Sequence, residues 1–320
     1  GPAAVPMREY TLMLDHALDS ADYHTGGSWD LPHMYDSAVR SKARRALRRA
    51  QRLAGLRFRW RRGTKSAMKV EAARHLYALR VEVAVKGWEY FEAFAEMLEA
   101  RRHHDFAAAM RAQERLLKIA GSLVEDYEYP MLDPGQWTGA KHYYNTFFGH
   151  ATAAGHACLS EGGRLIAGLK PEWDFLLEPQ GIGERLGLHD PFYRGGNWSQ
   201  ISTHHSWGTQ GMRYYFGEAW YRQRVKIPAT ATGNRVKLWF SGVDRGARVW
   251  LNGELLGTRP GTEFDITAFG GITRPFEFDA TDAILPGEEN VVVVRVVRDI
   301  CNELGTGGRR DVAMFYSPGG

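Results

Sequence analysis

The sequence predicts an α+β protein of more than one domain, in which an N-terminal α-helical bundle is followed by an antiparallel β-sandwich. Three observations lead to this prediction. Apolar residues recur every three or four positions through the first half of the chain, which is the period of an amphipathic helix. Short segments of alternating apolar and polar residues, each closed by a turn signal, fill the second half. With 320 residues, the chain is long enough for two domains that each bury a core.

The first part of the chain predicts short helices separated by helix breakers. Residues 8–20 form one, and two glycines and a proline separate it from the next. A second helix begins at Asp36 or Ser37, either of which can cap it, and runs towards Gly55. A segment rich in small and aromatic residues, 143–159, predicts the last helix of this half.

Two long helices lie between these short ones. From Ser66 onward, one apolar stripe continues for more than thirty residues. The next helix starts after Asp105, which can cap it, and ends before Pro130. Two long amphipathic helices joined by a short turn pack antiparallel, so we expect a bundle that the earlier helices complete. The stripe of the first long helix consists of Val70, Ala73, Tyr77, Val81, Ala84, Trp88, Phe91, Ala95 and Leu98.

The second half predicts strands that end at tight turns. Residues 219–227 alternate in character and stop at Pro228. Asn252-Gly253 closes another alternating segment and is the dipeptide most favoured for a tight hairpin, because both residues tolerate φ > 0. Residues 285–287, Leu-Pro-Gly, turn the chain into 291–297, which is apolar nearly throughout, as in a strand buried on both faces.

These strand motifs resemble those of a known family. Trp220-Tyr221-Arg222, the segment 240–257 and the segment 278–297 are similar, in this order, to the sugar-binding domain of family 2 glycoside hydrolases, the relatives of β-galactosidase and β-glucuronidase. The resemblance covers residues 171–318 and implies a jelly-roll, galactose-binding-like fold for the sandwich. The helical half resembles the region after the catalytic barrel in α-glucuronidase-like bacterial glycosidases.

We place the domain boundary near residue 165, where glycines interrupt both patterns. The helical domain is then 7–165, and the sugar-binding-like sandwich is 166–320. Residues 1–6, Gly-Pro-Ala-Ala-Val-Pro, have the composition of an expression scar, and we set them apart from the fold. We expect the chain to be excised from a longer protein.

The resemblance implies a sugar-binding domain without catalytic machinery. In this family the two catalytic carboxylates lie on a separate (β/α)₈ barrel, and this chain has no strand–helix alternation long enough for a barrel of about 250 residues. Asp279 and Asp282 match a turn of the family in which a side-chain oxygen caps local backbone amides. We therefore expect no catalytic residue. The sequence also contains no metal-binding or nucleotide-binding motif, so we expect no metal and no cofactor.

Two loop-like stretches, 197–213 and 302–311, are candidates for sugar binding. Aromatic rings can stack on the apolar faces of sugars, while His, Arg and amide groups can bond to hydroxyl or carboxylate groups. The arginines at these positions indicate an acidic sugar such as a uronate or a sulfated glycan. The candidate residues are His204, His205, Trp207, Arg213, Asn302, Arg309 and Arg310.

Positive charge is concentrated in one segment. Residues 40–65 contain twelve Lys and Arg and no Asp or Glu, and subtracting these twelve from the net charge of +4 leaves −8 for the rest. The segment could contact an anionic polymer, either nucleic acid or acidic polysaccharide. It could instead be a solvated helix face, or a surface that docks on a missing catalytic domain. We favour this second interpretation, because aromatic residues are sparse and no nucleic-acid-binding motif accompanies the charge.

Together these features predict the non-catalytic accessory part of a polysaccharide-degrading glycoside hydrolase, with carbohydrate, including acidic glycan, bound through the sandwich. The other expected partner is the missing catalytic domain. The alternatives are a sandwich that only supports that domain, a glycosidase active in its own right, and a nucleic-acid binder that uses residues 40–65. No apolar run approaches the ~20 residues of a membrane helix, so we expect no membrane partner. The resemblance suggests the periplasm or the cell exterior.

Overall fold

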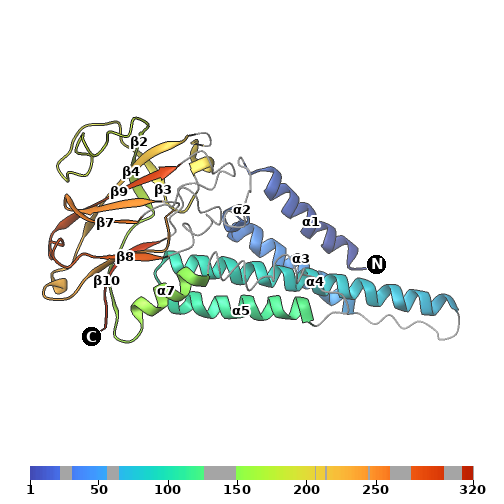
Figure 1. Ribbon diagram of the computed structural model, residues 1–320. Coiled ribbons are helices and arrows are strands. Elements are labelled where there is room, and N and C mark those ends of the chain that lie inside the picture. The colour runs from blue at the N-terminus through green and yellow to red at the C-terminus, as the bar shows by residue number, and fades with distance from the viewer. Residues whose placement is uncertain are drawn as a thin grey trace. The chain divides into compact units, whose positions relative to one another are not determined.

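A computed structural model describes residues 1–21, 31–55, 65–125, 149–205, 207–212, 215–243, 246–259, 275–298 and 312–319 (Figure 1). The chain divides into two compact units. The first comprises residues 1–96 and 112–140, and the second comprises 97–111 and 141–320. The second unit therefore takes in helical residues besides the predicted sandwich domain 166–320, whose limits stay a prediction.

The described helices follow the predicted apolar stripes closely. In the stripe of the longest helix, Val81, Trp88, Ala95 and Leu98 are buried, whereas Tyr77 is 53% exposed. None of the described helices is both long enough and apolar enough to span a membrane. The helices are α1 (Ala4–Asp19), α2 (Leu31–Met34), α3 (Ser37–Gly55), α4 (Lys65–Arg102), α5 (Phe106–Glu125) and α7 (His150–Leu159).

Trp88 of α4 lies at the centre of the first unit. Its ring packs on Leu47 of α3 and meets Tyr10 of α1 edge-on, with 5.8 Å between ring centroids. Ala43 and Ala50 of α3 are fully buried, and such small residues let neighbouring helices approach closely. Ala3 is buried too, and α1 begins at Ala4, so the segment 1–6 takes part in this fold.

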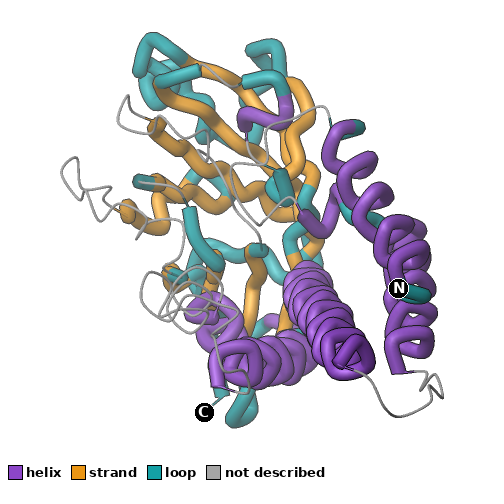
Figure 2. Tube along the Cα trace, turned by 90° about the vertical axis from the view of Figure 1, so that its right-hand side faces the viewer, coloured by secondary structure: helices purple, strands orange, loops and turns teal. Residues whose placement is uncertain are grey.

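The strands, orange in Figure 2, form two antiparallel sheets. One sheet has four strands in the order β1-β10-β5-β8, and the other has six in the order β3-β2-β4-β9-β6-β7. The predicted α+β class with an antiparallel β-sandwich is confirmed. The strands are β1 (Arg164–Gly168), β2 (Glu172–Glu178), β3 (Ser199–Ser202), β4 (Gly217–Lys226), β5 (Lys237–Phe240), β6 (Ala247–Leu251), β7 (Glu254–Arg259), β8 (Phe276–Asp279), β9 (Glu289–Arg298) and β10 (Ala313–Ser317).

The main core lies between the two sheets, because alternate residues of each strand point inward. Tyr221 of β4 and Val294 of β9 belong to this core from the six-stranded sheet, as do Leu238 of β5 and Phe315 of β10 from the other. The central strand β9 has Val291 to Val294 almost completely buried, as its apolar sequence predicted.

Two predicted turns are confirmed in detail. Asn252 and Gly253 have φ angles of 52° and 88° between β6 and β7, which is the left-handed conformation that a tight hairpin requires. The carboxylate of Asp279 accepts bonds from the amide and the hydroxyl of Thr281, at 3.0 and 2.6 Å. These bonds, with a smaller contribution from Arg235, lower the pKa of Asp279, as expected for a carboxylate that caps a turn.

Helical residues of the second unit cover the outer face of the four-stranded sheet. Phe106 of α5 packs edge-on against Trp239 of β5, with 5.6 Å between ring centroids. Cys158 and Leu159 of α7 pack on the same cluster. The Nε2 atom of His104 lies 3.1 Å from the carbonyl oxygen of Ala313, which joins the α4–α5 turn to β10.

Candidate functional site

The outer face of the six-stranded sheet carries charged and aromatic side chains at positions that would otherwise face solvent. Trp220 and Arg222 come from β4, Arg295 comes from β9, and Arg248 and Trp250 come from β6. Residues 179–198, here called the covering segment, connect β2 to β3 and lie over this face. The combination of rings and ions makes this face the candidate site within the described sandwich.

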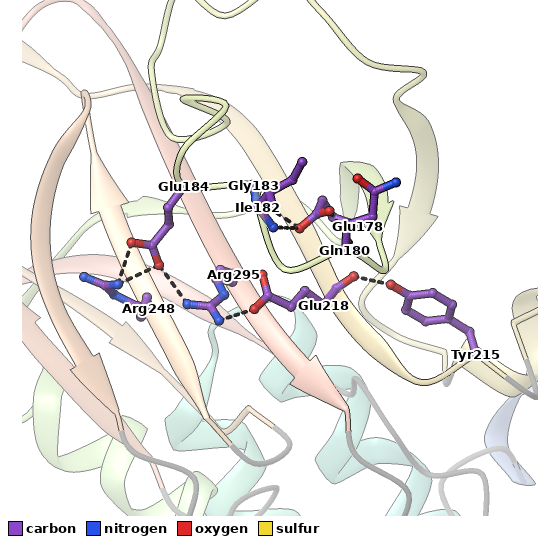
Figure 3. Close-up of polar contacts among 9 residues, drawn as sticks. All are labelled: Glu178, Gln180, Ile182, Gly183, Glu184, Tyr215, Glu218, Arg248 and Arg295. Atoms are coloured by element: carbon purple, nitrogen blue, oxygen red, sulfur yellow. Dashed lines mark hydrogen bonds and ion pairs between the residues drawn. The ribbon is translucent and has the colours of Figure 1, made fainter.

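Glu184 of the covering segment holds two arginines of the sheet (Figure 3). Arg248 donates to both oxygens of Glu184, at 2.6 and 2.5 Å, and Arg295 donates to one of them at 2.7 Å. Arg295 also donates to Glu218 of β4. All four side chains are at least two-thirds buried. One carboxylate thus ties the covering segment to two strands, and Arg295 donates to a carboxylate on either side of it.

Glu178 shapes the start of the covering segment. Its buried carboxylate accepts the backbone N–H groups of Gln180, Ile182 and Gly183, at 3.0, 2.7 and 3.0 Å (Figure 3). Beside it, the hydroxyl of Tyr215 donates to the carbonyl oxygen of Glu218, and burial raises the pKa of Tyr215 to about 12. These groups fix a turn, because a carboxylate that accepts several amides locks the backbone locally.

The aromatic rings of this face pack against other side chains of the protein. Trp220 stacks on Trp250 with centroids 5.3 Å apart, and His189 of the covering segment stacks on Trp250 at 5.4 Å. The guanidinium of Arg222 lies 4.2 Å from the ring centroid of Trp198 and pairs with Asp174. Since Trp220 and Trp250 are at most 4% exposed, neither offers a ring face to a sugar.

The expectation that Trp207 stacks on a sugar is wrong for this structure. Its side chain is completely buried in the core between the sheets, and its indole N–H donates to the hydroxyl of Tyr221. Phe175 and Tyr215 pack around the ring, with centroids 5.7 and 5.9 Å away. A ring enclosed in this way stabilises the sandwich.

His204 and His205 lie in the turn between β3 and the short 3₁₀ helix Trp207–Gln210. Both are partly buried. Gln210 organises this turn: its side chain accepts the N–H of Ser202 at 2.8 Å and donates to the carbonyl oxygens of Ser202 and His205, at 2.9 and 3.2 Å. Among the described residues, no group of three or more His, Cys, Asp or Glu side chains could hold a metal ion. The other predicted site residues, Arg213, Asn302, Arg309 and Arg310, lie outside the described residues.

Sequence reasoning missed the cluster of Glu184, Arg248 and Arg295. A signal for it was present, because Arg248 and Arg295 each interrupt an otherwise apolar run, 247–251 and 291–297 respectively. An arginine within such a strand needs a partner when it is covered. The strand pattern does not identify the partner, because Glu184 is separated from Arg248 by 64 positions and from Arg295 by 111 positions.

Comparison with known proteins finds relatives for part of this chain. No protein-family model matches. A β-glucuronidase of Paenibacillus borealis is 28% identical over 141 residues, which is 43% of this chain and 22% of the relative. A β-galactosidase of Thermoanaerobacter pseudethanolicus is 35% identical over 140 residues, which is 42% of this chain and 17% of the relative. Part of this chain is similar to family 2 glycoside hydrolases.

The match is partial, because the chain spans only about a fifth of the length of these curated relatives. A solved structure of β-glucuronidase from Ruminococcus gnavus covers 49% of this chain and 29% of its own, with 20% identity and a TM-score of 0.40. The sequence relatives confirm the resemblance that the strand motifs predicted, and they establish a relation to glycosidases for part of the chain.

Proposed function

We propose that this chain is a non-catalytic accessory part of a polysaccharide-degrading glycoside hydrolase, and that its sandwich supports a catalytic domain of the same protein. This proposal rests on one observation: the aromatic and charged side chains on the outer face of the six-stranded sheet bind other side chains of the same protein. The tryptophans of this face stack on one another and on His189, and its arginines pair with Glu184, Glu218 and Asp174. A supporting domain benefits from such a rigid face, whereas a sugar platform needs open rings.

The arrangement of carboxylates supports a non-catalytic role. Glycoside hydrolysis uses two carboxyl groups that flank the scissile bond, with room for the sugar between them. Here Arg295 occupies the space between Glu184 and Glu218 and donates to both. We expect the purified chain to release no nitrophenol from 4-nitrophenyl β-glucuronide or β-galactoside. Release that disappears in Glu184→Gln or Glu218→Gln would overturn the non-catalytic assignment.

Glycan binding through the sandwich is the second candidate function, and one observation favours it. Phe192, in the covering segment, is 78% exposed, and the exposed Arg194 lies two positions further on. An open ring beside a guanidinium can take the apolar face and an acidic group of a sugar. Arg213, Asn302, Arg309 and Arg310 remain proposed contributors to this binding.

Affinity gel electrophoresis with neutral and acidic polysaccharides tests this candidate. If the sandwich binds glycan, one polysaccharide retards the chain, and Phe192→Ala weakens the retardation at least fivefold. Leu186→Ala is the matched control, because Leu186 is an exposed apolar residue of the same segment. Equal loss in both variants, or no retardation by any polysaccharide, would leave the supporting role as the function of the sandwich.

A further inference from the structure

A groove between α1 and α3 of the first unit combines an apolar floor with a cationic rim. Its volume is about 520 Å³, within the usual range of small-molecule sites. The apolar part of the lining, here called the floor, consists of Leu12 and Met13 of α1 and Ala46 of α3, and the cationic part, here called the rim, consists of Lys42, Arg45 and Arg49 of α3. Glu9, which pairs with Arg49, and His16 of α1 complete the lining. Neither the supporting role nor glycan binding by the sandwich uses this groove.

The positive charge of the rim is only partly neutralised within the protein. Helix α3 contains seven Lys and Arg and no Asp or Glu. Arg44 pairs with Glu92, and Arg49 pairs with Glu9. By contrast, Lys42, Arg45, Arg48 and Arg52 are exposed and have no carboxylate partner among the described residues. Like charges three or four positions apart on a helix repel each other, so a bound anion would relieve a repulsion that the fold leaves in place.

The floor of the groove narrows the choice of anion. Leu12 is 54% exposed and lies beside the rim, so a ligand can contact an aliphatic surface and a guanidinium together. A pyranose ring that carries a carboxylate has this combination: an apolar C–H face and an anionic edge. Single-stranded nucleic acid instead uses aromatic rings for base stacking, and the groove lining contains no Phe, Tyr or Trp, its one ring being that of His16.

We infer that the α1–α3 groove binds an acidic polysaccharide of the polyuronate type, with sugar rings on Leu12 and Met13 and carboxylates at Lys42 and Arg45. The choice of a sugar among carboxylate-bearing ligands rests on the proposed function. The groove is not part of the sandwich. An experiment can therefore disprove binding in the groove without disproving the proposed function of the sandwich, and the reverse also holds.

The test is affinity gel electrophoresis of the full chain in polygalacturonate and in neutral dextran, across a series of salt concentrations. We expect retardation by polygalacturonate alone, weakening as salt rises. The double variant Lys42→Gln/Arg45→Gln should weaken it at least tenfold. The matched control is Lys170→Gln/Arg164→Gln, which removes the same two charges from exposed positions of the second unit, away from Phe192 and Arg194, and should retain the retardation. Circular dichroism verifies that both variants fold.

Additional measurements distinguish specific binding in the groove from general attraction between opposite charges. Leu12→Ser leaves the charge unchanged and should still weaken binding about threefold, because it removes the apolar contact. Equal losses in the two double variants, or no effect of Leu12→Ser, would overturn the groove as the site. Stronger competition by duplex DNA than by an equal charge of polygalacturonate would assign the groove to nucleic acid. No retardation by polygalacturonate would overturn this inference and leave the supporting role of the sandwich intact.

Discussion

Two asparagines join the turns beside β6 and β9. The side chain of Asn290 is fully buried, where it accepts the N–H of Leu285 at 2.8 Å and donates to the carbonyl oxygens of Leu285 and Glu288. Asn252 donates to Asn290 and to Ala283, both at 2.8 Å, and accepts the N–H of Val291 at 2.9 Å. Buried polar networks of this kind stabilise a fold only when every member is satisfied.

Replacing Asn290 with Ala should therefore destabilise the sandwich strongly. The change leaves the N–H of Leu285, the amide of Asn252 and two carbonyl oxygens without this partner, and we expect a loss of about 3 kcal/mol in the free energy of unfolding. Urea denaturation measures it. Asn234→Ala is the control, because Asn234 makes one side-chain bond, to Thr230, at an exposed site. A loss below 1 kcal/mol for Asn290→Ala would contradict the importance of the network.

His104 should make stability depend on pH. Burial lowers its pKa, an effect that the bond to Ala313 only partly offsets. The folded state thus binds this proton less readily than the unfolded chain, so the contribution is fully present above the unfolded pKa of about 6.5 and is lost as the pH falls below it. The loss can reach at most about 1.4 kcal/mol for each pH unit.

Unfolding in urea at pH 7.5 and 5.5 measures this dependence. His104→Asn should lose less stability than the parent chain between these two pH values, and asparagine tolerates the φ of 59° at this position. His103→Asn is the control, because the neighbouring ring is 72% exposed, and this variant should behave like the parent chain. Identical slopes for all three proteins would show that His104 does not contribute.

At the residue scale, sequence reasoning succeeds where the cause is local. The hairpin at Asn252-Gly253 follows from the φ angles that these two residues allow, and the turn at Asp279 follows from a bond to Thr281, two positions away. It failed for Trp207, whose loop-like surroundings suggested exposure. The burial of Trp207 depends on Tyr221 and Phe175, which the fold brings to it from other strands.

At the element scale, ion pairs and hydrogen bonds hold the first part of the covering segment, whereas Leu188, Tyr193 and Trp198 pack its later part on the sheet. Leu188 is the fully buried apolar side chain of the segment, whereas Leu186 and Phe192 are exposed. Glu184 and Glu178 supply the bonds that hold its first part. Segments with few buried apolar contacts open locally at low free energy, so these carboxylates decide how tightly the first part of the segment closes on the sheet.

Glu184→Gln should loosen the covering segment without unfolding the sandwich. The neutral amide cannot satisfy two arginines, so Arg248 and Arg295 would keep charge in a covered position without a full partner. We expect about 1–2 kcal/mol less protection of this segment from limited proteolysis and amide hydrogen exchange. Glu289→Gln is the control, because Glu289 pairs with Arg224 on the same sheet but is 60% exposed. Equal protection in both variants would contradict this function of Glu184.

Elements with a regular period were predictable, and contacts between distant elements were not. The stripes of α3, α4 and α5 lie close to their predicted positions, because helix period and breakers are local properties of the sequence. The covering segment shows neither the helix period nor the strand period. Its place over β4, β6 and β9 is set by hydrogen-bonded residue pairs that lie far apart in the chain.

At the scale of the whole molecule, the helices near residue 100 are shared between the compact units. The division passes within α4, after residue 96, and within α5, after residue 111. A boundary near residue 165 is what glycines and the change of period indicate, but periodicity does not reveal which core a helical side chain enters. Phe106 shows this, because its ring packs on Trp239 of the sandwich, although the sequence around Phe106 predicts a helix of the bundle.

Phe106→Ala should therefore destabilise the sandwich, although Phe106 lies 60 positions before residue 166. Removing a fully buried Phe costs about 3–5 kcal/mol, and the cavity would lie against Trp239, Met314 and Tyr316. Amide hydrogen exchange of β5 and β10 should accelerate accordingly. Phe94→Ala removes an equally buried ring from the part of α4 that belongs to the first unit, so it should leave exchange in these two strands nearly unchanged. The reverse pattern, with β5 and β10 sensitive to Phe94 and not to Phe106, would mean that the sandwich core ends where the sequence pattern places the boundary.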